Sequence, residues 1–479
     1  MVLMGTDEAL FEKFTKERYN ETMGLLSRRR KLHGLLFTVA SAASVVFFYL
    51  WKSLLPYGTT PLRYLSVSWL IGVPVVLFSF YWFMKYSGSM VLPDSIEIPE
   101  DRVIFQLTTL GRAPRTVYNS IRSVHYWARK VGINYESWII TEENADLLST
   151  EYADRIRSEG TRIVVVPSDY ETPKGTRSKA RALHYACELR KREFGLNDHI
   201  WIYHQDDETC IGEDTVLGIC SLISSGKYLI GSGIIIYPLN FENTPDHVQE
   251  FMRSYDDFRA MGSLMTRRNP LIGFHGSHFV VKQSVEDSVG NDFGTRKAIA
   301  EDYLLENAIR EAYGGRYGVI RGFAYEQSAG SIPAKLTQRR RWFIGALGLY
   351  PMKGRVPGYK KALVLYTQIA WMSAVLSLIA MVLSLVFRFD SVIPYSGVFF
   401  GVVWYGMIIS YYEGYKMHQA YIGKVNPWRT IANGIIGGLS DAIAPWYSLV
   451  TYRNWLMWLD KDSVSAGRGN AQTGKRPSR

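Results

Sequence analysis

The sequence predicts an α/β domain, built on a mixed and mainly parallel sheet, that is combined with transmembrane helices. Within residues 93–335, short apolar runs of strand character alternate with helical patterns, an order typical of a parallel sheet covered by helices. On either side of this domain, long apolar stretches occupy residues 35–86 and 361–452. The composition agrees with a membrane portion, because 47% of the residues are hydrophobic and 14% are aromatic.

The N-terminal part predicts a cytosolic segment followed by a membrane hairpin. Residues 1–34 are polar and mixed in charge, without the apolar stretch of a cleavable signal peptide. Two apolar runs, at 35–51 and about 65–86, flank a short turn, and each approaches the roughly 20 residues that span a bilayer. The basic residues at 28–31 place the N-terminus in the cytoplasm. A buried helical hairpin of a soluble protein is the alternative.

The C-terminal part is expected to return to the membrane. Residues 362–387 and 392–412 form two clear apolar spans. A third run, at 431–450, is interrupted by Asp441, a proline and several glycines, so a re-entrant or interfacial segment is as good an interpretation as a crossing. The basic tail at 463–479 is polar and is predicted to be disordered.

The net charge limits the kinds of partner that the protein can bind, and the cysteine content limits its disulfides and metal sites. The formal net charge of +11 is compatible with nucleic acid, anionic lipid or a phosphorylated small molecule. Because the basic residues gather at membrane edges and in one arginine-rich string, nucleic acid is not expected as a partner, and no obligate protein partner is evident. Three cysteines without a C-x-x-C pair argue against a disulfide framework or a zinc site.

Within the α/β domain, polar residues follow each predicted strand. The strands are expected at 102–111, 136–144, 161–169 and 199–208, and the helices between them at 113–132 and 176–195. Both helices end in glycine, as helix C-termini often do. Because ligands of such sheets bind beyond the carboxyl ends of the strands, the polar clusters at these ends are candidate site residues.

An acidic triplet follows the fourth strand. Asp206 and Glu208 are two residues apart on extended chain, so their side chains point the same way. Two carboxylates at a strand end suit a hard divalent cation, Mg²⁺ or Mn²⁺, that also binds phosphate oxygens. Asp207 is expected to point away or to make local bonds. A solvated acidic turn is the alternative.

A second acidic pair, Glu301 and Asp302, stands at the start of a predicted helix. Acidic residues in this position commonly just interact with the helix dipole, and this is the simpler interpretation. The functional interpretation is a general base, since a carboxylate in a cleft can take a proton from a hydroxyl nucleophile.

A third motif, QRRRW at 338–342, lies in the segment 336–360, just before the C-terminal apolar region. The planar arginine fork matches diphosphate oxygens, and the tryptophan offers a face to a sugar ring. An arginine cluster that contacts anionic lipid headgroups is the alternative. Residues 342–350 are expected to be amphipathic enough to lie in the membrane interface.

Taken in order, the three motifs resemble those of the membrane-embedded inverting glycosyltransferases of family 2, which include cellulose, hyaluronan and chitin synthases. The D-x-D-type, (E/T)D and Q-x-x-R-W motifs of that family read DDE, AED and QRRRW here, and the resemblance covers about residues 30–450. The strings TTLG, DDET and EDYLLENA are most similar to the egghead-type β-1,4-mannosyltransferases. One departure is Glu208, where the metal motif normally has aspartate.

The resemblance implies a GT-A-type, Rossmann-like catalytic domain and a role for each matching residue. Asp302 would be the catalytic base, and Asp206 and Glu208 would hold Mg²⁺ or Mn²⁺. The residues implied to bind the nucleotide sugar are Thr108, Thr109, Glu142, Glu143, Lys179, Arg181, Asp207, Gln338, Arg339 and Arg341. The residues implied to bind the acceptor are Gly276, Ser277, His278, Glu301 and Trp342. His204 and His275 are candidates by proximity only.

The implied activity is the transfer of mannose from GDP-mannose to a lipid-linked or glycolipid acceptor, with formation of a β-glycosidic bond by single displacement. The protein would be an integral, multi-pass membrane enzyme whose catalytic domain faces the cytoplasm. Two alternatives stay open: a processive polysaccharide synthase that uses a UDP-sugar, and a non-catalytic membrane scaffold or transporter. The motifs do not fix the donor nucleotide, the sugar or the acceptor.

Overall fold

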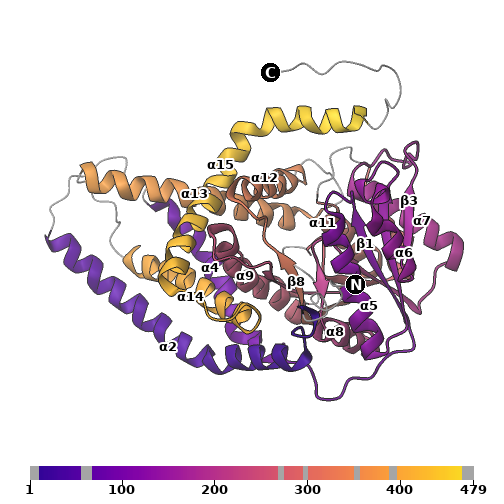
Figure 1. Cartoon of the computed structure of the whole chain (residues 1–479). Helices are drawn as coiled ribbons and strands as arrows, with labels where there is room; N and C mark the ends of the chain where they lie inside the picture. Colours follow the sequence, from indigo (N-terminus) through magenta and orange to yellow (C-terminus); the bar gives the residue numbers. More distant parts are fainter. Residues whose placement is uncertain are drawn as a thin grey trace.

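The computed structural model describes residues 10–54, 67–267, 275–294, 300–349, 356–387 and 396–465. Figure 1 shows a sheet covered by helices on the right and a group of long helices on the left. The chain begins in the long helices, continues through the sheet and returns to long helices. This order matches the distribution of apolar stretches along the sequence.

One mixed sheet of eight strands forms the centre of the α/β part, in the order β3-β2-β1-β4-β7-β6-β8-β5. Strands β1 to β4 pair in parallel with one another, as do β6 and β8, whereas β7 and β5 pair antiparallel with their neighbours. The strands are β1 (Arg102–Thr109), β2 (Tyr135–Glu142), β3 (Arg162–Val166), β4 (Ile200–Gln205), β5 (Cys210–Ile211), β6 (Ile230–Leu239), β7 (Phe279–Lys282) and β8 (Tyr317–Gln327).

The four predicted strands are confirmed as β1 to β4, and the two predicted helices as α5 (Pro114–Val131) and α7 (Lys179–Phe194). Every residue of β4 is buried, because a central strand is covered on both faces. Helix α5 starts with Pro114, whose fixed φ suits a first helical turn, and ends before Gly132, which has a φ of +81°.

The remaining elements complete the two parts. Those around the sheet are η3 (Asp146–Ser149), α6 (Glu151–Ser158), α8 (Glu213–Ser224), α9 (Pro245–Arg267), α10 (Gln283–Val289), α11 (Glu301–Tyr313) and α12 (Ile332–Gly348). Those of the helical part are α2 (Lys16–Leu54), η1 (Val67–Gly72), α4 (Val73–Tyr86), η2 (Ser87–Ser89), α13 (Gly358–Phe387), α14 (Ser396–Ile422) and α15 (Pro427–Ser465).

A buried ion-pair network fixes α7 and α10 against the sheet. The fully buried Arg190 guanidinium donates to Asp287 Oδ1 at 3.1 Å and to Glu286 Oε2 at 3.0 Å, and it also donates to Gln106 of β1. His204 of β4 lies 3.1 Å from Glu286 in the same network. His204 therefore has a structural role, and its proximity to the acidic triplet in sequence does not make it a site residue.

The N-terminal segment is packed onto the rest of the protein. Helix α2 runs without a break through the expected boundary between residues 34 and 35. Arg29 and His33 lie 3.0 Å and 2.5 Å from Glu413 of α14, whose side chain is fully buried. The basic stretch of α2 thus neutralises a buried carboxylate, in addition to any effect on membrane orientation.

Helix α9 connects the two parts, since it contacts β6 and β8 of the sheet and α4, α14 and α15 of the helical part. Gly414 allows α14 to approach α9, because a Cβ at this position would overlap the carbonyl oxygen of Phe251. One turn later, His418 Nε2 accepts a 2.8 Å hydrogen bond from the backbone N–H of Tyr237 in β6. The second half of α14 is therefore anchored on the α/β domain.

Among the described residues, one helical stretch, Leu70–Ser89, is long and apolar enough to cross a membrane. Helix α15 carries an additional apolar feature: the exposed side chains of Ile431, Ile435, Leu439 and Ile443 recur every four residues. Side chains at this spacing lie on one face of a helix. The segment expected at 431–450 thus belongs to a continuous helix with an exposed apolar stripe.

Two boundaries differ from those expected. Helix α15 continues to Ser465 and so includes the first three residues of the tail predicted at 463–479. Helix α12 crosses the expected boundary between residues 335 and 336, because Ser331 caps it by accepting a hydrogen bond from the N–H of Ala334. The turn expected between the first two apolar runs, and the start of the run at 392–412, lie outside the described residues.

Replacement of Arg190 by methionine is expected to lower the free energy of unfolding by about 3–5 kcal/mol, because it leaves two buried carboxylates without their cation. Thermal or denaturant unfolding of the purified protein measures this change. Arg192→Met, at an exposed position of the same helix, is the matched control and should change stability by less than about 0.5 kcal/mol. Equal effects of the two substitutions would contradict the proposed importance of the network.

Candidate functional site

The parallel strands β2, β1 and β4 end side by side and bring their polar residues to one edge of the sheet. Thr109 ends β1, Glu142 ends β2, and Asp206 directly follows β4. The Thr109 hydroxyl donates to Asp207 Oδ2 at 3.0 Å, so the first and fourth strand ends are in contact. The structure thus brings together the strand-end clusters that the sequence singled out.

Lys179 lies at the centre of this edge. Its ammonium is 2.5 Å from Asp206 Oδ1, 3.8 Å from Glu301 Oε1 and 3.1 Å from the carbonyl oxygen of Gly276. A Cβ placed on Gly276 would lie 3.5 Å from Asp302 Oδ2, so the Asp302 carboxylate borders the same space. The metal motif, the Glu301–Asp302 pair and the loop at residues 275–278, which we call the acceptor-side loop, therefore meet around one cation.

Burial and mutual repulsion shift the pKa values of these carboxylates. Burial, the Asp302 charge and the Asp206 charge raise the pKa of Glu301 to about 7, against an opposing effect of Lys179. Burial likewise raises the pKa of Asp302. Burial also disfavours ionised Asp206, yet its pKa is lowered overall, because Lys179, Arg341 and Arg253 hold positive charge near it. Ionised Asp206 and a proton-accepting pair of carboxylates thus coexist in one site.

A further carboxylate, Glu326 of β8, faces the acidic triplet. Glu326 Oε1 accepts hydrogen bonds from Thr209 Oγ1 at 2.7 Å and from Ser277 Oγ at 2.8 Å. Burial, a hydrogen bond with Asp207 and the charge of Glu326 raise the pKa of Glu208 well above its usual value. Glu326 is not among the residues predicted from the sequence, where its one signal is that it is a polar residue near the end of an apolar strand.

The acidic residues of this edge have the chemistry that a divalent cation requires. No group of three or more His, Cys, Asp or Glu side chains in the described part of the chain is arranged to hold a metal. Asp206 and Glu208 remain as a pair of oxygen ligands, and Mg²⁺ commonly binds one or two carboxylates together with substrate phosphates. Burial is the main cause of the raised pKa of Glu208, and the charges of Glu326, Asp206 and Asp207 add repulsion that such a cation would relieve. The pair therefore fits a cation shared with a phosphate ligand.

The remaining residues assigned to the nucleotide sugar line the ends of β1 to β3. Arg181 donates to Glu142 and, at 2.9 Å, to the carbonyl oxygen of Tyr170, so its charge is already paired. Glu143 Oε2 accepts from the backbone N–H of Ser168 at 3.0 Å. Among the described residues, no partner bonds to the buried hydroxyl of Thr108. An unsatisfied buried hydroxyl is unfavourable.

The acceptor-side loop contributes side chains of two kinds. Ser277 is buried and bonded to Glu326, and His275 Nε2 lies 2.8 Å from Asp257 Oδ1 of α9. His278, by contrast, is fully buried, and its two ring nitrogens contact Tyr203 OH at 2.9 Å and a backbone carbonyl at 3.1 Å. The expectation that His278 contacts the acceptor is therefore wrong, because no surface of its ring is accessible.

The QRRRW string lies within α12. Some of its side chains are buried and hold α12 in place, whereas others are exposed and available to a ligand. Arg339 is buried and donates to Glu250 Oε1 at 3.0 Å and to Asp441 Oδ1 at 2.7 Å, and it also bonds to Gln338 Oε1 at 3.1 Å. Its charge is thus paired by α9 and α15. Arg341 is exposed, and its positive charge lowers the pKa of Asp206, against the effect of burial.

The second half of the string packs inside the protein. Phe343 and Ile344 are 1% and 5% exposed and pack against Trp371 and Met372 of α13. The expectation that residues 342–350 lie in the membrane interface is therefore wrong for these two side chains, because a neighbouring helix covers them.

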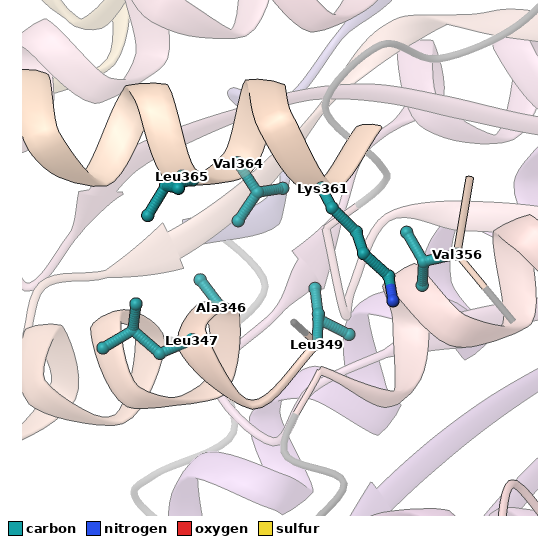
Figure 2. Close-up of a pocket in the computed structure, with 7 residues that line it drawn as sticks. All are labelled: Ala346, Leu347, Leu349, Val356, Lys361, Val364 and Leu365. Carbon is teal, nitrogen blue, oxygen red and sulfur yellow. The ribbon is translucent and has the colours of Figure 1, made fainter. Parts of the chain in front are cut away.

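An apolar groove of about 370 Å³ lies where α12 ends and α13 begins. Figure 2 shows aliphatic side chains that face one another across it, with the Lys361 ammonium at one end. The lining residues are Ala346, Leu347, Leu349, Val356, Lys361, Val364 and Leu365. The groove thus offers an apolar surface on the same helix that carries QRRRW.

Residues 201–412 match the family model described as "Glycosyl transferase family group 2". This segment of the chain is similar to the family 2 glycosyltransferases. The match begins in β4, directly before the acidic triplet, and continues through QRRRW into α14. All three sequence motifs therefore lie inside it, and the predicted family is confirmed. The mixed sheet and the family match together support the expected GT-A-like fold.

The chain is also similar to two β-1,4-mannosyltransferases over about two thirds of its length. The β-1,4-mannosyltransferase egh of Drosophila melanogaster is 29% identical over 328 residues, which cover 66% of this chain and 67% of that protein. The β-1,4-mannosyltransferase bre-3 of Caenorhabditis elegans is 29% identical over 301 residues, which cover 61% and 62% of the two chains. The chain therefore spans less than two thirds of bre-3.

Among solved structures, the mannosyltransferase PcManGT from Pyrobaculum calidifontis, in complex with GDP-Man and Mn²⁺, matches with a TM-score of 0.46 and 13% sequence identity. The match covers 81% of this chain and 99% of that chain.

Glu301→Gln is expected to become more stable than the wild type as the pH rises, and the difference in the free energy of unfolding should grow between pH 4.5 and about 7. In the wild type, unfolded Glu301 ionises above its usual pKa of 4.5, whereas the folded form holds its proton to about pH 7. Wild-type stability therefore falls between these pH values, by up to about 1.4 kcal/mol per unit of pKa shift, and glutamine removes this loss. Thermal unfolding from pH 4.5 to 8 measures it.

The control for this substitution is Glu311→Gln, at an exposed position of the same helix, whose effect should not change with pH. If the effect of Glu301→Gln on stability is constant across the pH range, the pKa of Glu301 is not raised in the folded protein.

Proposed function

We propose that this family 2 chain is a membrane-associated, inverting glycosyltransferase that transfers mannose from GDP-mannose to a hydroxyl of a lipid-linked or glycolipid acceptor. The observation that supports it best is the convergence of Asp206, Glu301 and Asp302 around the Lys179 ammonium. Such an arrangement combines a diphosphate site and a proton acceptor within one space.

Asp302 is the proposed general base. Its carboxylate borders Gly276, so an acceptor hydroxyl that reaches this glycine comes within range of Asp302 Oδ2. Burial raises the pKa of Asp302, which makes its ionised form a stronger proton acceptor. As the proton passes to Asp302, the acceptor oxygen bonds to the anomeric carbon and the bond to the diphosphate breaks. A single displacement of this kind converts an α-linked donor into a β-glycoside.

The leaving diphosphate needs positive charge at the opposite side of the anomeric carbon. Lys179 and Arg341 are the proposed sources, since both act electrostatically on Asp206 and Arg341 is exposed. Arg339, whose guanidinium is already held by Glu250 and Asp441, instead supports α12 and Trp342. Preorganised charge of this kind is commonly the largest contribution to group-transfer catalysis.

Asp206 and Glu208 are the residues that would hold Mg²⁺ or Mn²⁺. A bound divalent cation supplies further neutralisation of the diphosphate as it leaves. Thr109, Glu142 and the other strand-end residues of β1 and β2 would contact the nucleoside.

The choice of mannose is supported by the two relatives, which are named β-1,4-mannosyltransferases. The identity of 29% and the partial coverage leave the donor as a proposal. The membrane location is supported by the helix at Leu70–Ser89 and by the apolar stripe of α15. The proposed orientation, with the catalytic part facing the cytoplasm, rests on the basic residues at 28–31. A lipid-borne acceptor is supported by the apolar groove at the end of α12.

The test is a transfer assay with purified full-length protein, Mn²⁺, and GDP-mannose or UDP-sugars, in the presence of glycolipid acceptors. Label from GDP-mannose in a lipid-extractable, β-linked product is the expected result. A high-mass polymer would indicate a processive synthase instead. No transfer from any donor, with wild-type and Asp206→Asn proteins equal in nucleotide binding, would indicate a scaffold.

Asp302→Asn is expected to lower kcat by about 10²–10⁴-fold with little change in GDP affinity, because it removes the proton acceptor and leaves the diphosphate site intact. Single-turnover transfer and GDP binding measure the two effects. The control is Glu311→Gln, an exposed carboxylate of the same helix. Retention of more than a tenth of the activity by Asp302→Asn would assign the base to another residue.

Val364→Asp is expected to raise KM for a long-chain acceptor by about tenfold or more, because it places a charge in the apolar groove. KM for the donor and for a short-chain, water-soluble acceptor should stay unchanged. Ile369→Asp places the same charge on α13 outside the groove and serves as the control. An equal increase in KM for the long-chain and the short-chain acceptor would contradict a role for the groove in lipid binding.

A further inference from the structure

Helix α9 places a second arginine at the site, and no sequence motif points to it. The side chain of Arg253 is 21% exposed, and its guanidinium lies 4.4 Å from the ring centroid of Trp342 and 5.0 Å from that of Tyr237. One turn further along α9, Asp257 holds His275, the neighbour of Gly276. Arg253 therefore lies between the QRRRW helix and the acceptor-side loop.

The donors of Arg253 are largely uncommitted. Its closest carboxylate is Glu250 Oε2 at 3.8 Å, and within the described part of the chain its N–H groups make no hydrogen bond. Lys335 and Arg339 approach the other oxygen of Glu250 to 3.2 Å and 3.0 Å, so most of the charge of this carboxylate is neutralised without Arg253. A mostly buried guanidinium with free donors is unfavourable unless a ligand satisfies it.

The loop that α9 holds beside Arg253 leads directly to the acidic centre. His275, which Asp257 holds, precedes Gly276, and the Gly276 carbonyl oxygen accepts from the Lys179 ammonium at 3.1 Å, which also lies 2.5 Å from Asp206 Oδ1. The next residue of the loop, Ser277, donates to Glu326 Oε1 at 2.8 Å. Asp206 and Glu326 lie on the carboxyl side of the sheet, where the donor phosphates are proposed to bind. The guanidinium is thus within electrostatic range of that position, and its planar fork matches phosphate oxygens.

We propose that Arg253 binds the diphosphate of the sugar donor and forms, with Arg341, the pair of arginines that neutralises the leaving group. Arg339 has the more specific sequence motif, but its guanidinium is already held by two carboxylates. The proposal rests on the glycosyltransferase function proposed above, and it assigns the recognition of the diphosphate to α9 as well as to α12.

The experiment compares the affinities of GDP and GMP, and of UDP and UMP, for wild-type protein and Arg253→Met in Mn²⁺. Because one charge-assisted interaction is lost, the affinity for the nucleoside diphosphates is expected to fall by about 10–100-fold. The affinity for the nucleoside monophosphates should fall much less. Arg253→Lys should restore part of the affinity, since lysine keeps the charge without the fork. Arg259→Met, which removes a similarly buried arginine of α9 that pairs with Asp256, should change neither affinity.

The possible outcomes separate this proposal from the proposed function. Unchanged diphosphate affinity in Arg253→Met, with transfer lost through a higher acceptor KM, would show that Arg253 only positions Trp342, and would overturn the proposal. Absence of nucleotide binding by the wild type would overturn the proposed function itself. If Arg253→Met does not fold, as judged by thermal unfolding, the diphosphate affinities of Arg253→Lys and Arg253→Gln decide between the two roles.

Discussion

The ion pairing of Lys179 is the interaction on which the candidate site depends. Three carboxylates from different parts of the sequence, Asp206, Glu301 and Asp302, border one small space, and without a cation they would repel one another. The ammonium lies at the start of α7, whose first turn faces the strand ends. A compact charge with three donors can contact Asp206 and the Gly276 carbonyl together, so it fixes the distance between the metal motif and the proposed base.

Helix α9 extends this arrangement to the helical part of the protein. Glu250 binds Arg339 of α12, Asp257 binds His275 of the acceptor-side loop, and the helix itself packs on α4, α14 and α15. Each of these buried charges has a partner on another element, which makes the packing angles specific. The position of QRRRW relative to the sheet is therefore set by helices that are far apart in sequence.

The sequence predicted the first four strands, the two helices between them, the family and the three motifs. It did so because these features are local: apolar runs, helix-ending glycines and motif spacing need no knowledge of neighbours. It failed where packing decides. His278 has the same surroundings in sequence as Gly276, yet it is buried, and Phe343 and Ile344 are covered by α13. Glu326 had only the weak signal of a polar residue at a strand end, and Arg253 had no sequence signal, so their roles became visible through their neighbours in space.

By itself, the sequence determined the chemical groups available to the protein, since the identity and order of the acidic and arginine-rich motifs are properties of the chain. The tertiary structure decided which of these groups are free to act. Arg339 and Arg181 are arginines in the expected segments, but carboxylates of other elements already hold them, whereas Arg341 is exposed. The physical reason is that the availability of a charge depends on its partners, and in this protein those partners come from distant parts of the chain.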